Sequence, residues 1–332
     1  MHRPRWHGRP WSGAFNVVMA TGIVSIASRL AGLGWPSLVL LWLSCLAFVA
    51  LAASELRRAR HPLANLRLAR DLANGFAAFT FVAAACVVGT RIMTRSEATR
   101  VISGVLLGCG VLVWLGLVLA LLTGRVVRSA SGARGEWLLA VVASEGVSIL
   151  AAHLASTGRG DALRTAAIAM WALGGALYLL IALALAVRLL RRPLRPGELT
   201  PDWWIVMGAL AIFAVAAATL DRAGVGPARV SGVVAWALAT AWIPVLLAAE
   251  LWQARALGPP RWEPARWTMV FPLGMYSAAA QVVGQVSGAA WLTDLGRAWL
   301  PIALGAWLAL AVGEVRAALR GVPSFARRSA TR

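Results

Sequence analysis

Ten stretches of predominantly apolar residues, each about as long as a membrane is thick, are the feature that most constrains this chain. A helix needs about 20 such residues to cross the hydrocarbon core of a bilayer. The connections between the stretches are short. We therefore predict an all-α integral membrane protein, a single membrane domain over 1–332 with short tails. Its ten transmembrane helices are expected near residues 14–34, 37–55, 73–93, 98–122, 137–157, 162–189, 202–221, 228–253, 266–290 and 295–318.

The composition excludes an ordinary soluble domain, because 60% of the residues are hydrophobic and the mean hydropathy is +0.73. The net charge of +19 comes entirely from arginine on the basic side. These arginines occupy short loops between apolar stretches rather than one soluble face, so we expect no nucleic-acid binding. Cys45, Cys86 and Cys109 lie within apolar stretches and lack the spacing of a metal site or a disulfide framework.

The distribution of arginine predicts the orientation. The two tails and the loops after the even-numbered spans carry 23 arginines, whereas the loops after the odd-numbered spans carry 9. Since basic residues gather on the cytoplasmic side, both termini are expected to be cytoplasmic. The first span follows Arg3, Arg5 and Arg9 but lacks a clear cleavage site, which favours an uncleaved helix over a signal peptide.

A weak internal repeat links the odd-numbered spans. Acidic residues stand at their starts at intervals of 65, 66 and 61, at Asp71, Glu136, Asp202 and Glu263. Each repeat unit would be one helical hairpin, and five hairpins around an axis would leave a central pore. The acids also have a local explanation, because a carboxylate in the first turn of a helix interacts favourably with the helix dipole.

Glu145 is the strongest candidate for a functional polar residue, because it lies within the apolar run Leu138–Leu154. A carboxylate at membrane depth is costly and usually functional. It could line the pore as a proton-linked group, or it could be a neutral glutamate packed between helices. His153 is about 80° away around the same helix. We interpret it as a residue near the membrane–water interface whose ring is hydrogen-bonded, rather than as a functional partner of Glu145.

Pro272 is expected to kink the span that contains it, because its ring crowds the carbonyl of Thr268 and it has no amide hydrogen. Such a kink could direct the Phe271 ring into the lumen of a pore. Alternatively, the kink could serve helix packing alone, and Phe271 could be a core residue beside it. Small and polar residues elsewhere let helices approach or leave room for a solute. They are Asn16, Thr21 and Gly22 in the first span and Gly208 in the seventh.

We expect no catalytic residues, metal or cofactor. Of the four histidines only His153 lies in a span, whereas a haem held between helices needs paired ligands. The spans also lack a GxSxG motif and an aspartate pair, so an intramembrane enzyme is not favoured.

The sequence resembles the tellurite-resistance/dicarboxylate transporter family, which includes slow-type anion channels and malate and sulfite transporters. The resemblance rests on three stretches in the same order as in the family. They are FNVVMATGIVSI (15–26), TPDWWIVMGALAI (200–212) and WTMVFPLGMYS (267–277), the last of which contains Gly274.

The resemblance implies five hairpins, with odd helices lining a pore and even helices facing lipid, and commonly a homotrimer. It also implies that Phe271 matches the family's pore-occluding phenylalanine. We expect Pro272, beside it, to be part of the gate. Glu145 departs from the family, where a polar uncharged residue is expected.

Taken together, we predict a plasma (inner) membrane transporter or channel for small inorganic or organic anions, with membrane lipid as its surroundings. Four-carbon dicarboxylates such as malate are the first candidates. The alternatives are a chloride or nitrate channel, a sulfite- or tellurite-linked exporter, and an anion-binding membrane sensor that does not transport. The predicted site residues are Phe271, Pro272, Glu145, Asn16, Thr21, Gly22, Gly208 and Gly274.

Overall fold

The structure, a computed structural model, describes residues 13–58, 72–93, 96–123, 133–158, 160–258 and 263–319. The predicted cytoplasmic tails and Asp71 lie outside these ranges. Within them the chain is helical and contains no strand. The ten long helices are α1 (Asn16–Leu30), α2 (Gly34–Arg58), α4 (Leu72–Ile92), α5 (Glu97–Thr123), α6 (Leu139–Ala155), α7 (Asp161–Arg191), α8 (Ile205–Arg222), α9 (Pro227–Leu257), α10 (Trp267–Ser287) and α11 (Ala290–Leu319).

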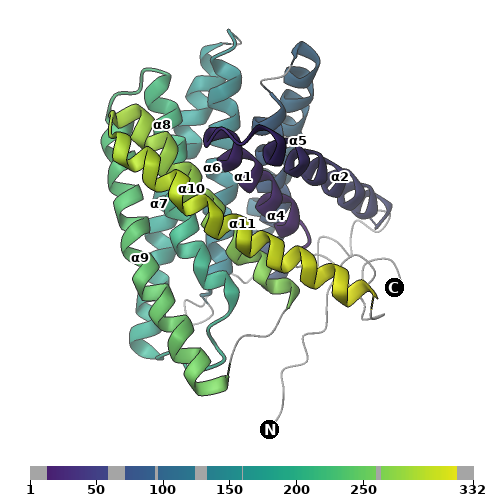
Figure 1. The fold of residues 1–332 in the computed structure, drawn as a ribbon. Helices are drawn as coiled ribbons and strands as arrows, with labels where there is room; N and C mark the ends of the chain where they lie inside the picture. The colour runs from purple at the N-terminus through teal and green to yellow at the C-terminus, as the bar shows by residue number, and fades with distance from the viewer. Residues whose placement is uncertain are drawn as a thin grey trace.

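These helices pack in two ways (Figure 1). Each helix contacts the next one in the chain as a pair: α1 with α2, α4 with α5, α6 with α7, α8 with α9 and α10 with α11. The first members of the pairs also contact one another in a closed cycle, α1–α4–α6–α8–α10–α1. We call these five the inner helices and their partners the outer helices.

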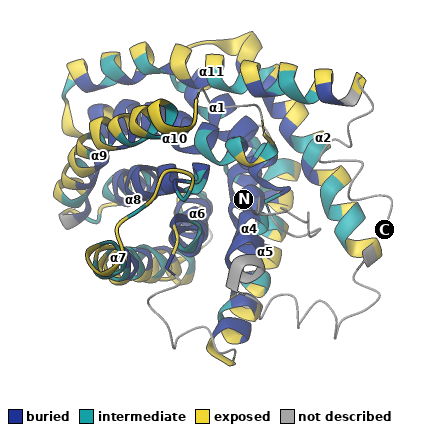
Figure 2. Ribbon diagram, turned by 90° about the horizontal axis from the view of Figure 1, so that it is seen from below, coloured by how far each residue is buried: buried dark blue, intermediate teal, exposed yellow. Residues whose placement is uncertain are grey.

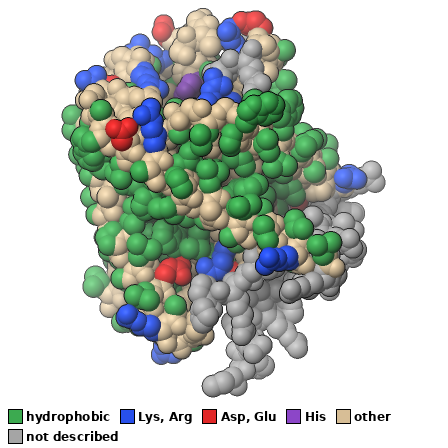
Figure 3. Space-filling view, viewed as in Figure 1, with side chains coloured by type: hydrophobic (Ala, Val, Ile, Leu, Met, Phe, Trp, Pro, Cys, Tyr) green, Lys and Arg blue, Asp and Glu red, His purple; other side chains and the backbone are tan. Residues whose placement is uncertain are grey.

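Burial separates the two sets clearly (Figure 2). In α6 and α8, 89% of the most apolar stretch is buried inside the protein, whereas in α7 and α11 the shares are 11% and 17%. The exposed side chains of the outer helices are nevertheless apolar, for example Leu179, Leu183 and Leu308. An apolar surface of this extent is stable only in contact with lipid or another protein. Figure 3 shows it as a hydrophobic band, with charged side chains towards the two ends of the molecule.

Seven of the described helices are long and apolar enough to cross a membrane, and α1 and Phe76–Ile92 are shorter apolar helices. The 21-residue α10 falls in neither group, and it carries Pro272, Gln281 and Gln285. Inner helices tolerate such residues because protein, rather than lipid, surrounds them. The membrane-protein class expected from the sequence is therefore confirmed.

Three inner helices begin with a 3-10 turn at Gly135–Leu138, Pro201–Trp204 and Pro264–Arg266. Glu136, Asp202 and Glu263 lie at these turns, and the N-cap residues of the three turns make no side-chain cap. Instead, the Asp202 carboxylate accepts a 3.0 Å hydrogen bond from the backbone amide of Glu136 in the preceding pair. A Cβ at Gly135 would lie 2.4 Å from the Asp202 carbonyl oxygen, so glycine permits this contact. The acid thus joins two repeat units.

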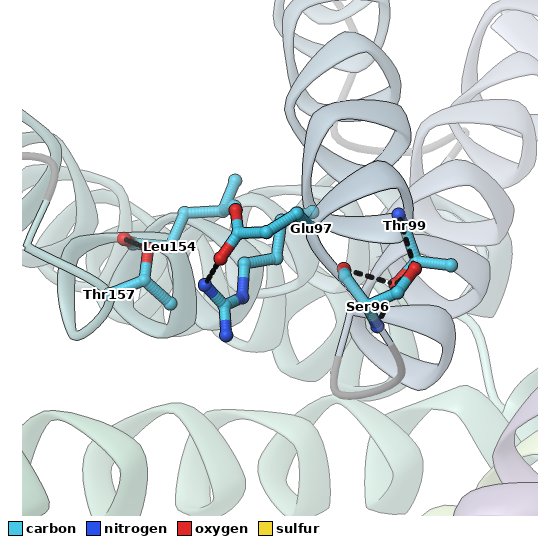
Figure 4. Close-up of polar contacts among 6 residues, drawn as sticks. Ser96, Glu97, Thr99, Leu154 and Thr157 are labelled. Atoms are coloured by element: carbon cyan, nitrogen blue, oxygen red, sulfur yellow. Dashed lines mark hydrogen bonds and ion pairs between the residues drawn. The ribbon is translucent and has the colours of Figure 1, made fainter.

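The start of the outer helix α5 is fixed by polar contacts (Figure 4). Ser96 and Thr99 cap the start of α5 reciprocally: the Thr99 amide donates to Ser96 Oγ, and the Ser96 amide donates to Thr99 Oγ1. Glu97 pairs with Arg100 one turn along the helix. Such capping boxes fix where a helix starts.

Candidate pore and its mouth

A cavity of about 120 Å³ lies between the inner helices, and all five contribute to its wall. One ordered water needs about 10–15 Å³ on this scale, so the cavity has room for several waters or one small anion. Most lining residues are apolar, and most of them lie in the carboxyl-terminal halves of the helices. They are Ile23, Ile26, Leu30, Cys86, Val87, Thr90, Gly146, Ile149, His153, Ile212, Val215, Thr219, Arg222, Met275, Ala278 and Val282.

Phe271 lies on the α10 face that lines this cavity, one turn before the wall begins. The α10 lining residues are Met275, Ala278 and Val282. At 100° per residue, Phe271 projects within about 20° of the mean direction of these three. Its side chain is 2% exposed. A large buried ring on this face of α10 therefore lies next to the cavity, towards the amino end of the helix.

Pro272 and Gly208 bring α10 and α8 together beside Phe271. A Cβ at position 208 would lie 2.8 Å from Pro272 Cγ, so any larger residue would push the helices apart. The helix α10 continues on both sides of Pro272, from Trp267 to Ser287. Gly274 has the same role towards α1, because a Cβ there would lie 3.0 Å from Ile23 Cγ2.

The predicted residues of α1 make helix contacts. Thr21 Oγ1 accepts a 2.9 Å hydrogen bond from Trp307 Nε1 of the outer helix α11. A Cβ at Gly22 would lie 2.6 Å from Val87 Cγ1 of α4. Asn16 is buried at the start of α1, and its Nδ2 would lie 2.8 Å from a Cβ at Gly13. None of the eight predicted site residues is among the residues that line the cavity.

Glu145 faces an outer helix. A Cβ at Gly174 of α7 would lie 2.0 Å from Glu145 Oε1, so the carboxyl group occupies the space above this glycine. The side chain is fully buried, and neither oxygen has a hydrogen-bond partner among the described residues. The cavity side of α6 is instead formed by Gly146, Ile149 and His153. We therefore do not include Glu145 in the pathway proposed below.

His153 and Arg222 contribute polar side chains to the cavity wall. The sequence patterns did not predict that either residue would line a cavity. Both line it, from the last turns of α6 and α8. The ring of His153 contacts the Ile149 carbonyl oxygen through Nδ1 at 2.8 Å. Arg222 donates from Nη2 to Gln285 Oε1 of α10 at 2.6 Å. Figure 3 shows basic side chains and a histidine at the upper end of the molecule.

Arg91 is a second arginine that only the structure brings to notice. It is 4% exposed, in the last turn of α4. Its Nε donates to Ser25 Oγ at 3.1 Å and its Nη2 donates to Ser37 Oγ at 2.6 Å. Ser25 and Ser37 each donate to the other's backbone carbonyl. The guanidinium group thus joins α1, α2 and α4 beside the cavity wall at Thr90.

Most of the chain matches one protein family, and this match indicates the class of protein that the arrangement forms. Residues 11–315 match the family described as voltage-dependent anion channel. The chain belongs to this family. Its members are channels and transporters for anions rather than enzymes, in agreement with the resemblance found in the sequence.

Two curated relatives have been found in Mycobacterium tuberculosis, in strains CDC 1551 / Oshkosh and ATCC 25618 / H37Rv. Both are described as uncharacterized membrane proteins. Each is 39% identical to this chain over 117 residues, which are 32% of this chain and 59% of the relative. The match therefore spans less than two thirds of either relative. Together with the family, it supports a location in a membrane.

Proposed function

We propose that this chain crosses the membrane ten times, as five hairpins, and passes small anions along the axis of its inner helices. One observation carries the proposal: a single cavity is lined by residues from all five inner helices. A space between only two or three helices would be an ordinary packing defect. A space to which every repeat unit contributes coincides with the axis of the closed cycle.

The parallel inner helices support the choice of anions. All five run in the same direction, because each is separated from the next by one outer helix. Their amino ends, which carry the positive ends of the helix dipoles, therefore lie together at one end of the axis. Under the predicted topology this end faces the cytoplasm of a cell whose plasma membrane holds the protein, with both termini on that side.

Phe271 closes the axis in this proposal. Its buried ring lies one turn from the cavity wall, and the Gly208–Pro272 contact fixes the backbone beside it. Anions would pass when the ring rotates away. The proline and glycine are supporting residues of the gate, because they set the distance between α8 and α10 at this level.

Four-carbon dicarboxylates such as malate are the proposed substrates, as the family resemblance suggests, and a homotrimer is the proposed assembly. The size of the cavity fits one small anion. It does not by itself favour malate over chloride, nitrate or sulfite. A channel for the inorganic anions and a tellurite-linked exporter are therefore the alternatives within the same class, and a non-transporting sensor is the alternative outside it.

The test is anion flux into proteoliposomes, with malate, chloride and sulfite offered separately, for the native chain and for Phe271→Ala. Removing the ring is expected to raise flux at least ten-fold, since the obstruction is steric. The anion with the largest flux identifies the substrate.

Phe48→Ala is the matched control. Phe48 is also a buried phenylalanine, but it lies on the outer helix α2 and packs against Phe15 and Phe81. Its loss should leave flux unchanged. Equal flux in the native chain and Phe271→Ala would rule out the phenylalanine gate, and no flux in either folded protein would favour the sensor.

A further inference from the structure

The last turns of the inner helices share a pattern that the function proposed above does not use. A basic residue stands in the last turn of four of them: Arg29 in α1, Arg91 in α4, His153 in α6 and Arg222 in α8. In α10 the corresponding residue is Gln285, which contacts Arg222. These five positions follow one another at intervals of 62, 62, 69 and 63 residues. They are therefore equivalent positions of the five repeat units, and His153 stands where three other units have arginine.

The electrostatics of this end explain why positive charge is needed there. Five parallel helices bring five carboxyl ends, each with the negative end of a dipole, to one mouth of the cavity. Such a mouth repels anions unless basic groups offset it. Basic residues here also stabilise the helix ends, which is the purely structural explanation of the pattern. That explanation does not require any of them to line a cavity.

Only some of the basic groups can reach an anion in the cavity. Arg222 and His153 line it, whereas Arg29 is exposed and absent from its wall. Arg91 is turned towards the hydroxyl groups of Ser25 and Ser37. Within the part of the chain that the structure describes, Arg222 and His153 are thus the side chains that present nitrogen donors to an anion in the cavity.

The ring of His153 is oriented so that one nitrogen remains for such an anion. Its Nδ1 lies 2.8 Å from the Ile149 carbonyl oxygen, which can only accept, so Nδ1 carries the hydrogen. A further proton must therefore bind at Nε2. It would add both a positive charge and a second N–H donor. A guanidinium and an imidazolium together suit a carboxylate or another small oxyanion.

The other charged groups described at this end either form ion pairs or lie outside the cavity wall. On α8, Asp221 pairs with Arg229 at 3.1 Å. On α5, Glu97 pairs with Arg100. The start of α7 carries Asp161 and Arg164, neither of which lines the cavity. On the helices that pack against α6, Arg222 is the charged residue that shares the cavity wall with His153 among the described residues.

We propose that Arg222 and His153 form an oxyanion-recognition site at this mouth, and that protonation of His153 at Nε2 strengthens it. Arg222 supplies a permanent charge, and His153 supplies a charge that depends on pH. This site deepens the proposed function, since its ligand is an anion on the way to the axis. Binding does not require passage, however, so the two proposals can fail separately.

Sulfate binding to the full-length protein in detergent tests the site, with calorimetry at pH 5.5 and pH 7.5. Sulfate is the probe because its charge is constant over this range, unlike that of malate. The dissociation constant of the native chain is expected to be roughly ten-fold lower at pH 5.5, a usual size for coupling between two bound species. Arg222→Gln is expected to weaken binding at both pH values.

Two substitutions at position 153 separate recognition from structure. His153→Gln should bind weakly at both pH values, whereas His153→Arg, which restores the residue of the other repeat units, should bind tightly at both. Arg100→Gln is the control, because it removes a charge from the same end of the molecule but outside the cavity. Its binding should match the native chain. An unchanged pH dependence in His153→Gln, or unchanged affinity in Arg222→Gln, would overturn the proposal.

A direct measurement uses the small number of histidines. Replacing His2, His7 and His61 by glutamine leaves His153 as the sole imidazole of the chain. Its nuclear magnetic resonance signals are expected to move when sulfate is added, and to stay in place when Arg222→Gln is also present. Signals that do not respond to saturating sulfate in the native background would show that the anion binds elsewhere, whatever the flux through Phe271→Ala.

Discussion

At the scale of residues, Glu145 and Gly174 fit each other closely. Because a Cβ at position 174 would lie 2.0 Å from Glu145 Oε1, Gly174→Ala is expected to destabilise the protein by about 1–3 kcal/mol. Glu145→Ala opens the space that the new methyl group needs, so the double variant should lose less than the two single losses combined. Thermal unfolding followed by tryptophan fluorescence measures this coupling. Gly116→Ala, which meets open space, is the control, and additive losses would contradict the contact.

At the scale of elements, Arg91 holds three helices together. Its hydrogen bonds to Ser25 and Ser37 connect α4 to the first hairpin. Arg91→Met keeps the apolar stem but leaves buried hydroxyl groups with fewer partners, so we expect a loss of about 2–4 kcal/mol. Arg57→Met, at an exposed position of α2, should change little. Equal unfolding midpoints for Arg91→Met and the native chain would show that the hairpins hold without this group.

At the scale of the whole molecule, inner and outer helices should differ in their contact with lipid. A photoactivatable reagent dissolved in the bilayer is expected to label α2, α5, α7, α9 and α11 several times more than α6 and α8, which are 89% buried over their most apolar stretches. Mass spectrometry of the digested protein measures the labelled residues. The detergent-denatured protein is the control, because its helices should be labelled alike. Equal labelling of α6 and α7 in the folded protein would contradict the closed cycle.

The sequence by itself determined where the apolar helices lie, because length and hydropathy are local properties. The predicted stretch 98–122 and the helix α5 (Glu97–Thr123), for example, agree almost to the residue. It also determined the family, through the three ordered stretches around Asn16, Gly208 and Phe271. The acids at the starts of the inner helices were predicted as well, but their partner was not. Asp202 binds the amide of Glu136 in another repeat unit, which no local pattern contains.

Only the tertiary structure decided which side of each helix faces the axis. In a soluble protein an apolar face indicates the interior, but in a membrane the lipid is as apolar as the core, so the two sides look alike in sequence. The sequence therefore left Glu145 between a pore-lining position and a position packed between helices, and the structure places its carboxyl group against α7. His153 and Arg222, 69 residues apart, meet at one cavity because five repeat units close into a cycle, and closure is a property of packing between units.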